Sequence, residues 1–121
     1  MIQIQIGDFI AEVETTKDTV RHYETLGLLS PKWENGRRIY TVKDVEDFQV
    51  IKEMQAFGLA LKDIQAIFES KQKDGCGSEP LIKSVKAKLK EKLATLMEEK
   101  AVIDQKVAGV KQTLKALKDL T

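Results

Sequence analysis

The chain has 121 residues, of which 42% are hydrophobic and 32% charged, and its formal net charge is +1. This length suits one small domain with an extension, and the composition is too apolar for a disordered chain. No apolar run approaches the roughly 20 residues that span a bilayer, and the N-terminal residues lack the features of a signal peptide. The single cysteine excludes an internal disulfide, so we expect a cytoplasmic protein with no membrane partner.

Positive charge is concentrated in one part of the N-terminal half. Residues 16–43 contain six bases and three acids, whereas residues 44–77 contain seven acids and four bases. A local excess of positive charge is the electrostatic footprint expected of nucleic-acid binding. The ten lysines of residues 78–121 are interpreted more simply, as the solvated face of a long helix.

The first elements along the chain are predicted to be two short helices. Residues 4–6 are predicted to form a short strand or an extended lead-in, and residues 8–13 are predicted to form one short helix. Thr15 or Thr16 can cap a second helix over residues 17–26, because a threonine hydroxyl accepts from the free amides of a first turn. Two short helices joined by a threonine-containing turn are typical of a helix-turn-helix.

A β-hairpin is predicted for residues 31–40. The Asn-Gly pair at its centre supplies the two positive φ angles of a type I′ turn. Arg37 and Arg38 follow the turn and point to opposite faces of their strand. One of them can therefore face DNA while the other braces the hairpin or an acid on the next helix. Trp33 is a candidate for a ligand pocket, although packing within the wing or against DNA is favoured.

Two longer helices are predicted after the hairpin. The first begins after Thr41 and ends at Gly58. Its apolar stripe, spaced by three residues, consists of Val45, Phe48, Ile51, Met54 and, at the end, Phe57. The second runs from about Leu61 to Glu69, and its buried face consists of Leu61, Ile64, Ile67 and Phe68. Residues 71–77 are polar and contain two glycines, so they are predicted to form a linker.

The longest predicted element is a helix within residues 78–121. Its serine and proline at the start suit a first helical turn. Apolar residues recur at three- and four-residue steps, apart from one seven-residue gap in which Lys100 occupies the expected apolar place. They are Ile82, Val85, Leu89, Leu93, Leu96, Ile103, Val107, Val110, Leu114 and Leu117. A heptad seam on so long a helix predicts a homodimeric coiled coil. The alternative is folding back onto the N-terminal unit, which requires a break near Gly109.

The second short helix carries side chains that suit duplex DNA. Arg21, His22 and Tyr23 are consecutive, so they fan across about two-thirds of the helix circumference. A buried face would take Val20, Tyr23 or Leu26, which leaves Arg21 and His22 outward. An exposed arginine can fork onto guanine or a phosphate, and a tyrosine hydroxyl can bind a phosphate. Together with the arginine-rich hairpin, this pattern predicts a helix that enters a groove beside a basic wing.

Several short motifs follow one another in a distinctive order. They are Ile6-Gly7, Thr19-Val20-Arg21-His22-Tyr23-Glu24, Gly27-Leu28-Leu29, Pro31, Asn35-Gly36-Arg37-Arg38-Ile39-Tyr40, Asp44 and Gly58-Leu59-Ala60-Leu61-Lys62-Asp63-Ile64. In this order, over residues 2–70, the chain resembles the MerR family of bacterial transcription regulators. The resemblance implies a mainly α fold with three parts, namely a winged helix-turn-helix in residues 1–70 (helix-turn-helix about 7–26, wing about 31–40), a linker in 71–77, and an antiparallel coiled-coil dimerisation helix in 78–121.

The resemblance also implies a function and a set of contacts. Family members bind a palindromic operator in double-stranded promoter DNA as homodimers, and they distort an overlong spacer so that RNA polymerase engages both promoter elements. By position, the DNA contacts would be Thr16, Lys17, Arg21, His22 and Tyr23 on the helix, with Lys32, Arg37, Arg38 and Tyr40 on the wing. The family usually has an aromatic residue where His22 and Arg37 stand, and a histidine there would make binding mildly pH-dependent.

The sequence offers little for metal sensing or catalysis. Cys76 stands where the family's metal sensors place a first cysteine, but thiolate metal sites need more soft ligands than one cysteine supplies. We expect no metal or cofactor, and Cys76 is interpreted as an incidental linker residue or, less simply, as a sensor thiol. The residues of a catalytic set are missing, so no enzyme is expected. The alternative function is a coiled-coil protein-interaction adaptor without specific DNA binding, which would not shift promoter DNA.

Overall fold

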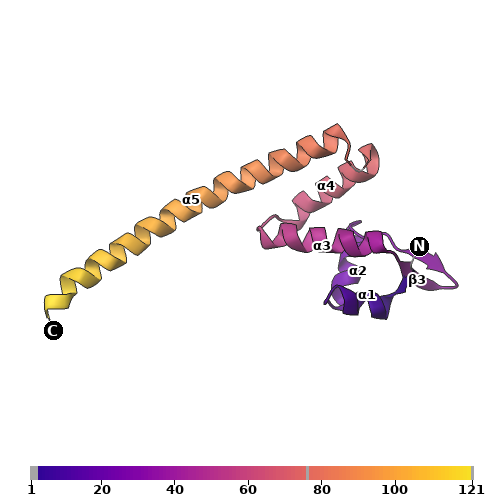
Figure 1. Cartoon of the computed structure of the whole chain (residues 1–121), viewed down its shortest axis with the longest axis horizontal. Helices are drawn as coiled ribbons and strands as arrows, with labels where there is room; N and C mark the ends of the chain where they lie inside the picture. Colours follow the sequence, from indigo (N-terminus) through magenta and orange to yellow (C-terminus); the bar gives the residue numbers. More distant parts are fainter. Residues whose placement is uncertain (1–2, 76, 121) are drawn as a thin grey trace. The chain divides into compact units, whose positions relative to one another are not determined.

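The computed structural model describes residues 3–75 and 77–120. Its elements, in chain order, are β1 (Ile4–Gln5), α1 (Ile6–Glu12), α2 (Lys17–Thr25), β2 (Lys32–Glu34), β3 (Arg37–Tyr40), α3 (Val42–Ala56), α4 (Leu61–Asp74), α5 (Glu79–Leu117) and a 3-10 turn (Lys118–Leu120) (Figure 1). The chain divides into two compact units, residues 1–85 and residues 86–121. None of the helices in the described part of the chain combines the length and the apolar character needed to cross a membrane.

The two short helices form the predicted helix-turn-helix. Thr16, rather than Thr15, is the N-cap of α2, because its hydroxyl accepts from the backbone N–H of Thr19 at 3.2 Å. The helix ends at Thr25, and Gly27 follows with a φ of +76°. That left-handed conformation favours glycine and stops the helix. The first helix begins at Ile6, two residues before the predicted start.

The wing is a three-stranded antiparallel sheet with the order β1-β3-β2. Its hairpin turn is confirmed, since Asn35 and Gly36 both have positive φ angles, +50° and +75°, as a type I′ turn requires. Trp33 of β2 lies opposite Arg38 of β3 in the register. Within the expected lead-in at residues 4–6, Ile4 and Gln5 form a true strand, β1, which pairs with the other edge of β3, whereas Ile6 already begins α1.

The third helix follows a capping box. The Asp44 carboxylate accepts from the backbone N–H of Thr41 at 2.8 Å, which satisfies a donor that the helix itself leaves free. The predicted apolar stripe is buried at Val45, Phe48 and Ile51. Phe57 was expected to extend this stripe, but it is 47% exposed. The helix ends at Ala56 and the chain turns at Gly58, so Phe57 lies outside the packed face.

The fourth helix is longer than predicted. It continues to Asp74, so residues 71–74, which were expected in a linker, are helical. Lys71 Nζ lies 2.6 Å from Asp47 Oδ1 of α3, and this ion pair ties the extra turn to the domain. Gly75 then ends the helix with a φ of +91°. Cys76, the possible sensor thiol, lies outside the described residues.

An aromatic cluster forms the centre of the first unit. The Phe9 ring stacks on Tyr40 with centroids 4.2 Å apart and meets Phe48 edge-on at 6.0 Å. All three side chains are almost completely buried, so they pack α1, β3 and α3 into one core. The beginning of α5 belongs to the same core through Leu81 and Val85. The helix-turn-helix and the wing therefore share one rigid support.

The long helix exposes most of its predicted seam. Through Gly109 it runs unbroken among the described residues, so the break needed for folding back does not occur there. Val85 packs against the core of the first unit. The other predicted dimerisation residues are between 38% and 63% exposed: Leu89, Leu93, Leu96, Ile103, Val107, Val110 and Leu114. A contiguous apolar stripe of this kind is a mark of an interaction surface.

Candidate nucleic-acid interface

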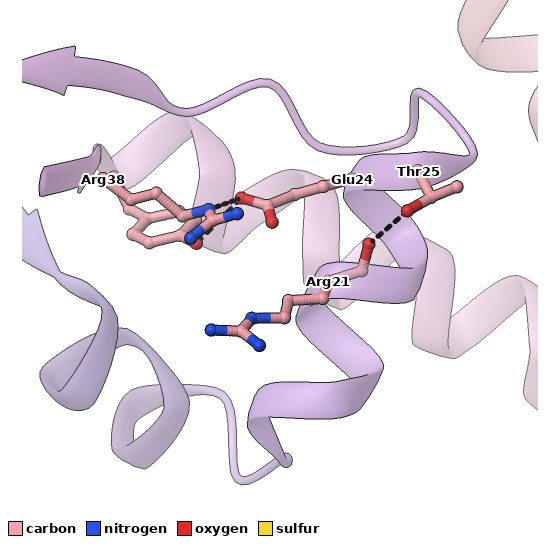
Figure 2. A network of polar contacts seen from close by, with 5 residues as sticks. Arg21, Glu24, Thr25 and Arg38 are labelled. Carbon is pink, nitrogen blue, oxygen red and sulfur yellow. Dashed lines mark hydrogen bonds and ion pairs between the residues drawn. The ribbon is translucent and has the colours of Figure 1, made fainter. Parts of the chain in front are cut away.

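The polar face of α2 is open to solvent. Four of the predicted contacts are exposed there: Thr16, Lys17, Arg21 and His22. Val20 and Tyr23 are buried on the opposite face, and both were among the candidates for a buried face. Figure 2 shows the Arg21 guanidinium extending away from the helix, while the Thr25 hydroxyl donates to the Arg21 carbonyl at 3.0 Å. The guanidinium is thus available to an external acceptor.

Tyr23 was predicted as a DNA contact, and the structure places it in the core instead. Its side chain is 4% exposed, and its hydroxyl donates to Gln55 Oε1 of α3 at 2.6 Å. Burial raises the pKa of the Tyr23 hydroxyl, and the hydrogen bond with Gln55 opposes this rise only in part. The side chain therefore orients α2 on α3 rather than pointing toward a groove.

A polar network joins the wing to α2. Arg38 Nε donates to Glu24 Oε1 at 3.0 Å (Figure 2), and the Tyr40 hydroxyl donates to the same oxygen at 3.0 Å. The Arg38 guanidinium also covers the Trp33 ring, 4.6 Å from its centroid, which is a cation–π geometry. Arg38 is thus the brace that the hairpin pattern predicted, although its acid lies on the preceding helix and not on the next one.

Tyr40 was also predicted as a wing contact, and this prediction is wrong. The residue is completely buried and stacks on Phe9, so no surface remains for DNA. Burial is the largest cause that raises the pKa of its hydroxyl, and the adjacent Glu24 carboxylate adds to the effect. A neutral hydroxyl is the form that donates to that carboxylate. Tyr40 therefore anchors strand β3 of the wing to the core.

The outer surface of the wing carries the remaining predicted contacts. Lys32 and Arg37 are exposed, and Trp33 is 59% exposed. Glu24 already engages Arg38, whereas no ion pair engages Lys32 or Arg37 among the residues that the structure describes. The exposed basic set on α2 and the wing, which we call the basic face, consists of Lys17, Arg21, His22, Lys32 and Arg37.

Sequence reasoning missed the residues that hold the basic face in place. Glu24 lies in the motif quoted from α2, yet nothing in its spacing indicates that it meets β3. One oxygen of Glu24, Oε2, is buried without a hydrogen-bond partner in the described part of the chain, so the carboxylate depends on Arg38 for compensation. Within residues 3–75 and 77–120, no three His, Cys, Asp or Glu side chains gather as a metal site would need.

A family model described as "MerR HTH family regulatory protein" matches residues 4–71, which cover the helix-turn-helix, the wing and most of α4. The chain belongs to the MerR family. This assignment confirms the family that the order of sequence motifs indicated. It also agrees with the fold, since the described elements are a helix-turn-helix, a small antiparallel wing and a long C-terminal helix.

Relatives of this MerR-family chain include named regulators. It is 32% identical over 109 residues to the multidrug-efflux transporter 2 regulator of Bacillus subtilis (strain 168), covering 88% of this chain and 34% of that protein. It is also 32% identical over 68 residues to the mercuric resistance operon regulatory protein of Bacillus cereus, covering 54% of this chain and 52% of that protein. The chain thus spans only about a third to a half of these relatives.

Solved structures share the fold of this MerR-family chain. A MerR-family transcriptional regulator from Bacillus cereus superposes with a TM-score of 0.68 at 21% identity, covering 97% of this chain and 84% of that one. HiNmlR, described as a MerR family regulator lacking the sensor domain and bound to promoter DNA, gives a TM-score of 0.66 at 22% identity. That likeness covers 96% of this chain and 91% of that one. At such identity the likeness establishes the fold.

Proposed function

We propose that this MerR-family chain is a DNA-binding transcriptional regulator that acts on promoter DNA as a homodimer. The observation that carries the proposal is the basic face, whose two parts are held together by the Glu24–Arg38 pair. Support comes from relatives named as regulators of a transporter and of a resistance operon. Further support comes from the similar fold of a family regulator bound to promoter DNA.

The proposed contacts divide by chemistry. Arg21 extends from the open side of α2 and suits a base edge in the major groove, where an arginine can bind guanine at two points. Lys32 and Arg37 on the wing suit phosphates, which fix the position of a protein without reading sequence. Thr16, Lys17 and His22 complete the set at the start and outer side of α2. Arg38 is proposed as a positioning residue that sets the wing relative to α2.

The dimer is proposed to form through the apolar stripe of α5. Full burial of a large aliphatic side chain contributes about 1.5–3 kcal/mol, so seven half-exposed residues on each chain offer a substantial driving force against the cost of association. Two copies paired in antiparallel fashion would present two basic faces to a palindromic operator. We propose that distortion of the promoter spacer then controls engagement by RNA polymerase. This action is non-catalytic and takes place in the cytoplasm.

The proposal is tested by titrating the full chain against labelled fragments of its upstream genomic region and measuring fluorescence anisotropy at several salt concentrations. We expect one fragment to bind with an affinity that falls steeply with salt, because phosphate contacts release counterions. Arg21→Ala should weaken binding by about 1–3 kcal/mol, or roughly 5- to 150-fold, and Arg37→Ala should weaken binding to all fragments alike and reduce the salt slope by about 1.

Lys62→Ala is the matched control, because Lys62 is an exposed cation on α4 outside the basic face. It should bind the fragment like the wild type. Absence of binding to every upstream fragment would favour the protein-interaction adaptor. Equal losses in the control and in the two arginine variants would show that only net charge matters, which would contradict the assigned contacts.

A further inference from the structure

A pocket of about 530 Å³ opens on the first unit, away from any residue proposed to read bases. Lys32 of β2, Lys43 in the first turn of α3, and Phe68 and Lys71 near the end of α4 line it, with Leu28 from the loop before the wing. Its volume lies in the range of small-molecule sites, about 300–1,000 Å³. The pocket is therefore lined by the start of β2 in the wing and by helices α3 and α4.

The lining has an excess of positive charge. Its two acids are already engaged: Asp47 accepts from Lys71 at 2.6 Å, and Asp44 accepts from the backbone N–H of Thr41 at 2.8 Å. Lys32 and Lys43 are exposed at the pocket, and no ion pair engages either of them in the part of the chain that the structure describes. Two unpaired ammonium groups on one concave surface favour an anion.

The lining also has two apolar side chains, Leu28 and Phe68, beside the uncharged polar Ser30, Thr41 and Gln72. Leu28 and Phe68 are 3% and 5% exposed, so the surface that they offer to the pocket is small and firmly held. Lys71 lies 5.4 Å from the centroid of the Phe68 ring, which keeps its aliphatic stem against that ring. A ligand with one anionic group and a compact apolar part would match both the lysines and the small apolar surface of Leu28 and Phe68.

We propose that this pocket binds a small organic anion, whose phosphate or carboxylate pairs with Lys32 and Lys43 and whose apolar part lies against Leu28 and Phe68. Binding would link the first residue of β2 to the first turn of α3 through one ligand. Lys32 belongs to the basic face, so an occupied pocket withdraws one positive charge from DNA. This regulatory consequence rests on the proposed function, whereas the binding itself does not.

The test uses phenyl phosphate as the probe and the full chain without DNA. Backbone amide shifts of the ¹⁵N-labelled protein are followed by NMR during titration. We expect saturable shifts confined to residues around Lys32, Lys43 and Lys71. Lys43→Met keeps the apolar stem and removes the charge, so it should raise the Kd for phenyl phosphate about tenfold or more, which corresponds to about 1.4 kcal/mol. Benzyl alcohol, a neutral molecule with the same ring, should give no saturable shift.

Lys62→Met serves as the control for loss of one surface lysine, and it should bind phenyl phosphate like the wild type. The proposal is overturned if phenyl phosphate produces no localised saturable shifts, if benzyl alcohol binds equally well, or if Lys43→Met leaves the Kd unchanged. Should Lys43→Met weaken operator binding without affecting phenyl phosphate, the lysine belongs to the DNA interface and the pocket proposal is wrong. Binding of phenyl phosphate by a protein that ignores all promoter fragments would instead refute the proposed function alone.

Discussion

Replacing Arg38 by methionine should separate the bracing of the wing from contact with DNA. Methionine keeps much of the aliphatic stem but removes the guanidinium that meets Glu24 Oε1 at 3.0 Å. The variant leaves Glu24 with the Tyr40 hydroxyl as its remaining donor among the described residues. We expect loss of folding stability and, through a looser wing, a secondary loss of operator affinity.

The magnitude follows from the exposure of the pair. Exposed ion pairs contribute about 0.2–1 kcal/mol, whereas removing one partner of a fully buried pair costs about 3–5 kcal/mol. The Arg38 side chain is 27% exposed and that of Glu24 is 13% exposed, so the pair lies between these limits. Loss of the cation–π contact with Trp33 adds about 0.5–1 kcal/mol. The free energy of unfolding should therefore fall by about 2–3 kcal/mol.

The assay is urea unfolding followed by circular dichroism, combined with operator titration at several salt concentrations. Glu24→Gln, Arg38→Met and the double variant form a cycle that should give a coupling energy of about 1–2 kcal/mol, because the double variant strands no charge. Arg37→Met is the comparison and should change stability by less than about 0.5 kcal/mol. The reasoning is refuted if Arg38→Met unfolds like the wild type yet lowers the salt dependence of operator binding as much as Arg37→Met does.

Two further predictions concern the core and the long helix. The pKa values of Tyr23 and Tyr40 are both raised by burial, so the stability they provide is complete below the ordinary tyrosine pKa of about 10 and is lost as pH rises above it. Above that pH, each tyrosine should lower the free energy of unfolding by up to about 1.4 kcal/mol per pH unit. In urea titrations, the free energy of unfolding of Tyr40→Phe should therefore fall less steeply with alkaline pH than that of the wild type. An unchanged slope would contradict the assignment. Val107→Glu places a charge in the apolar stripe, so it should convert the proposed dimer to a monomer in sedimentation equilibrium, whereas Lys106→Glu should not. A dimeric Val107→Glu variant would rule out this seam.

Local signals in the sequence predicted most of the fold. The Asn-Gly turn, the threonine caps and the glycine stops are short-range features. Each of them predicted the start or the end of an element close to where the structure has it. The end of α4 was predicted too early because the extra turn contains polar residues with no apolar periodicity. Lys71 holds that turn through Asp47, a residue 24 positions away along the chain, and pattern analysis does not detect such a pair.

The candidate site was predicted less completely, and the reason is again long-range contact. The sequence shows that Arg37 and Arg38 point to opposite faces, but it does not show which face meets Glu24. Tyrosine suits both a phosphate contact and a buried hydrogen bond, so Tyr23 and Tyr40 could be assigned from composition to either role. Only the positions of Gln55 and Glu24, on neighbouring elements in space, decide that both hydroxyls point inward.

The chain contains a single tryptophan, and it lies on the wing beneath the Arg38 guanidinium. All indole fluorescence from the protein therefore comes from Trp33, which lies next to the Glu24–Arg38 ion pair between α2 and β3. Trp33 is 59% exposed, so a quencher dissolved in the buffer can reach it. Wing movement on addition of DNA or a small anion can thus be followed in real time by the native fluorophore, without attaching a dye.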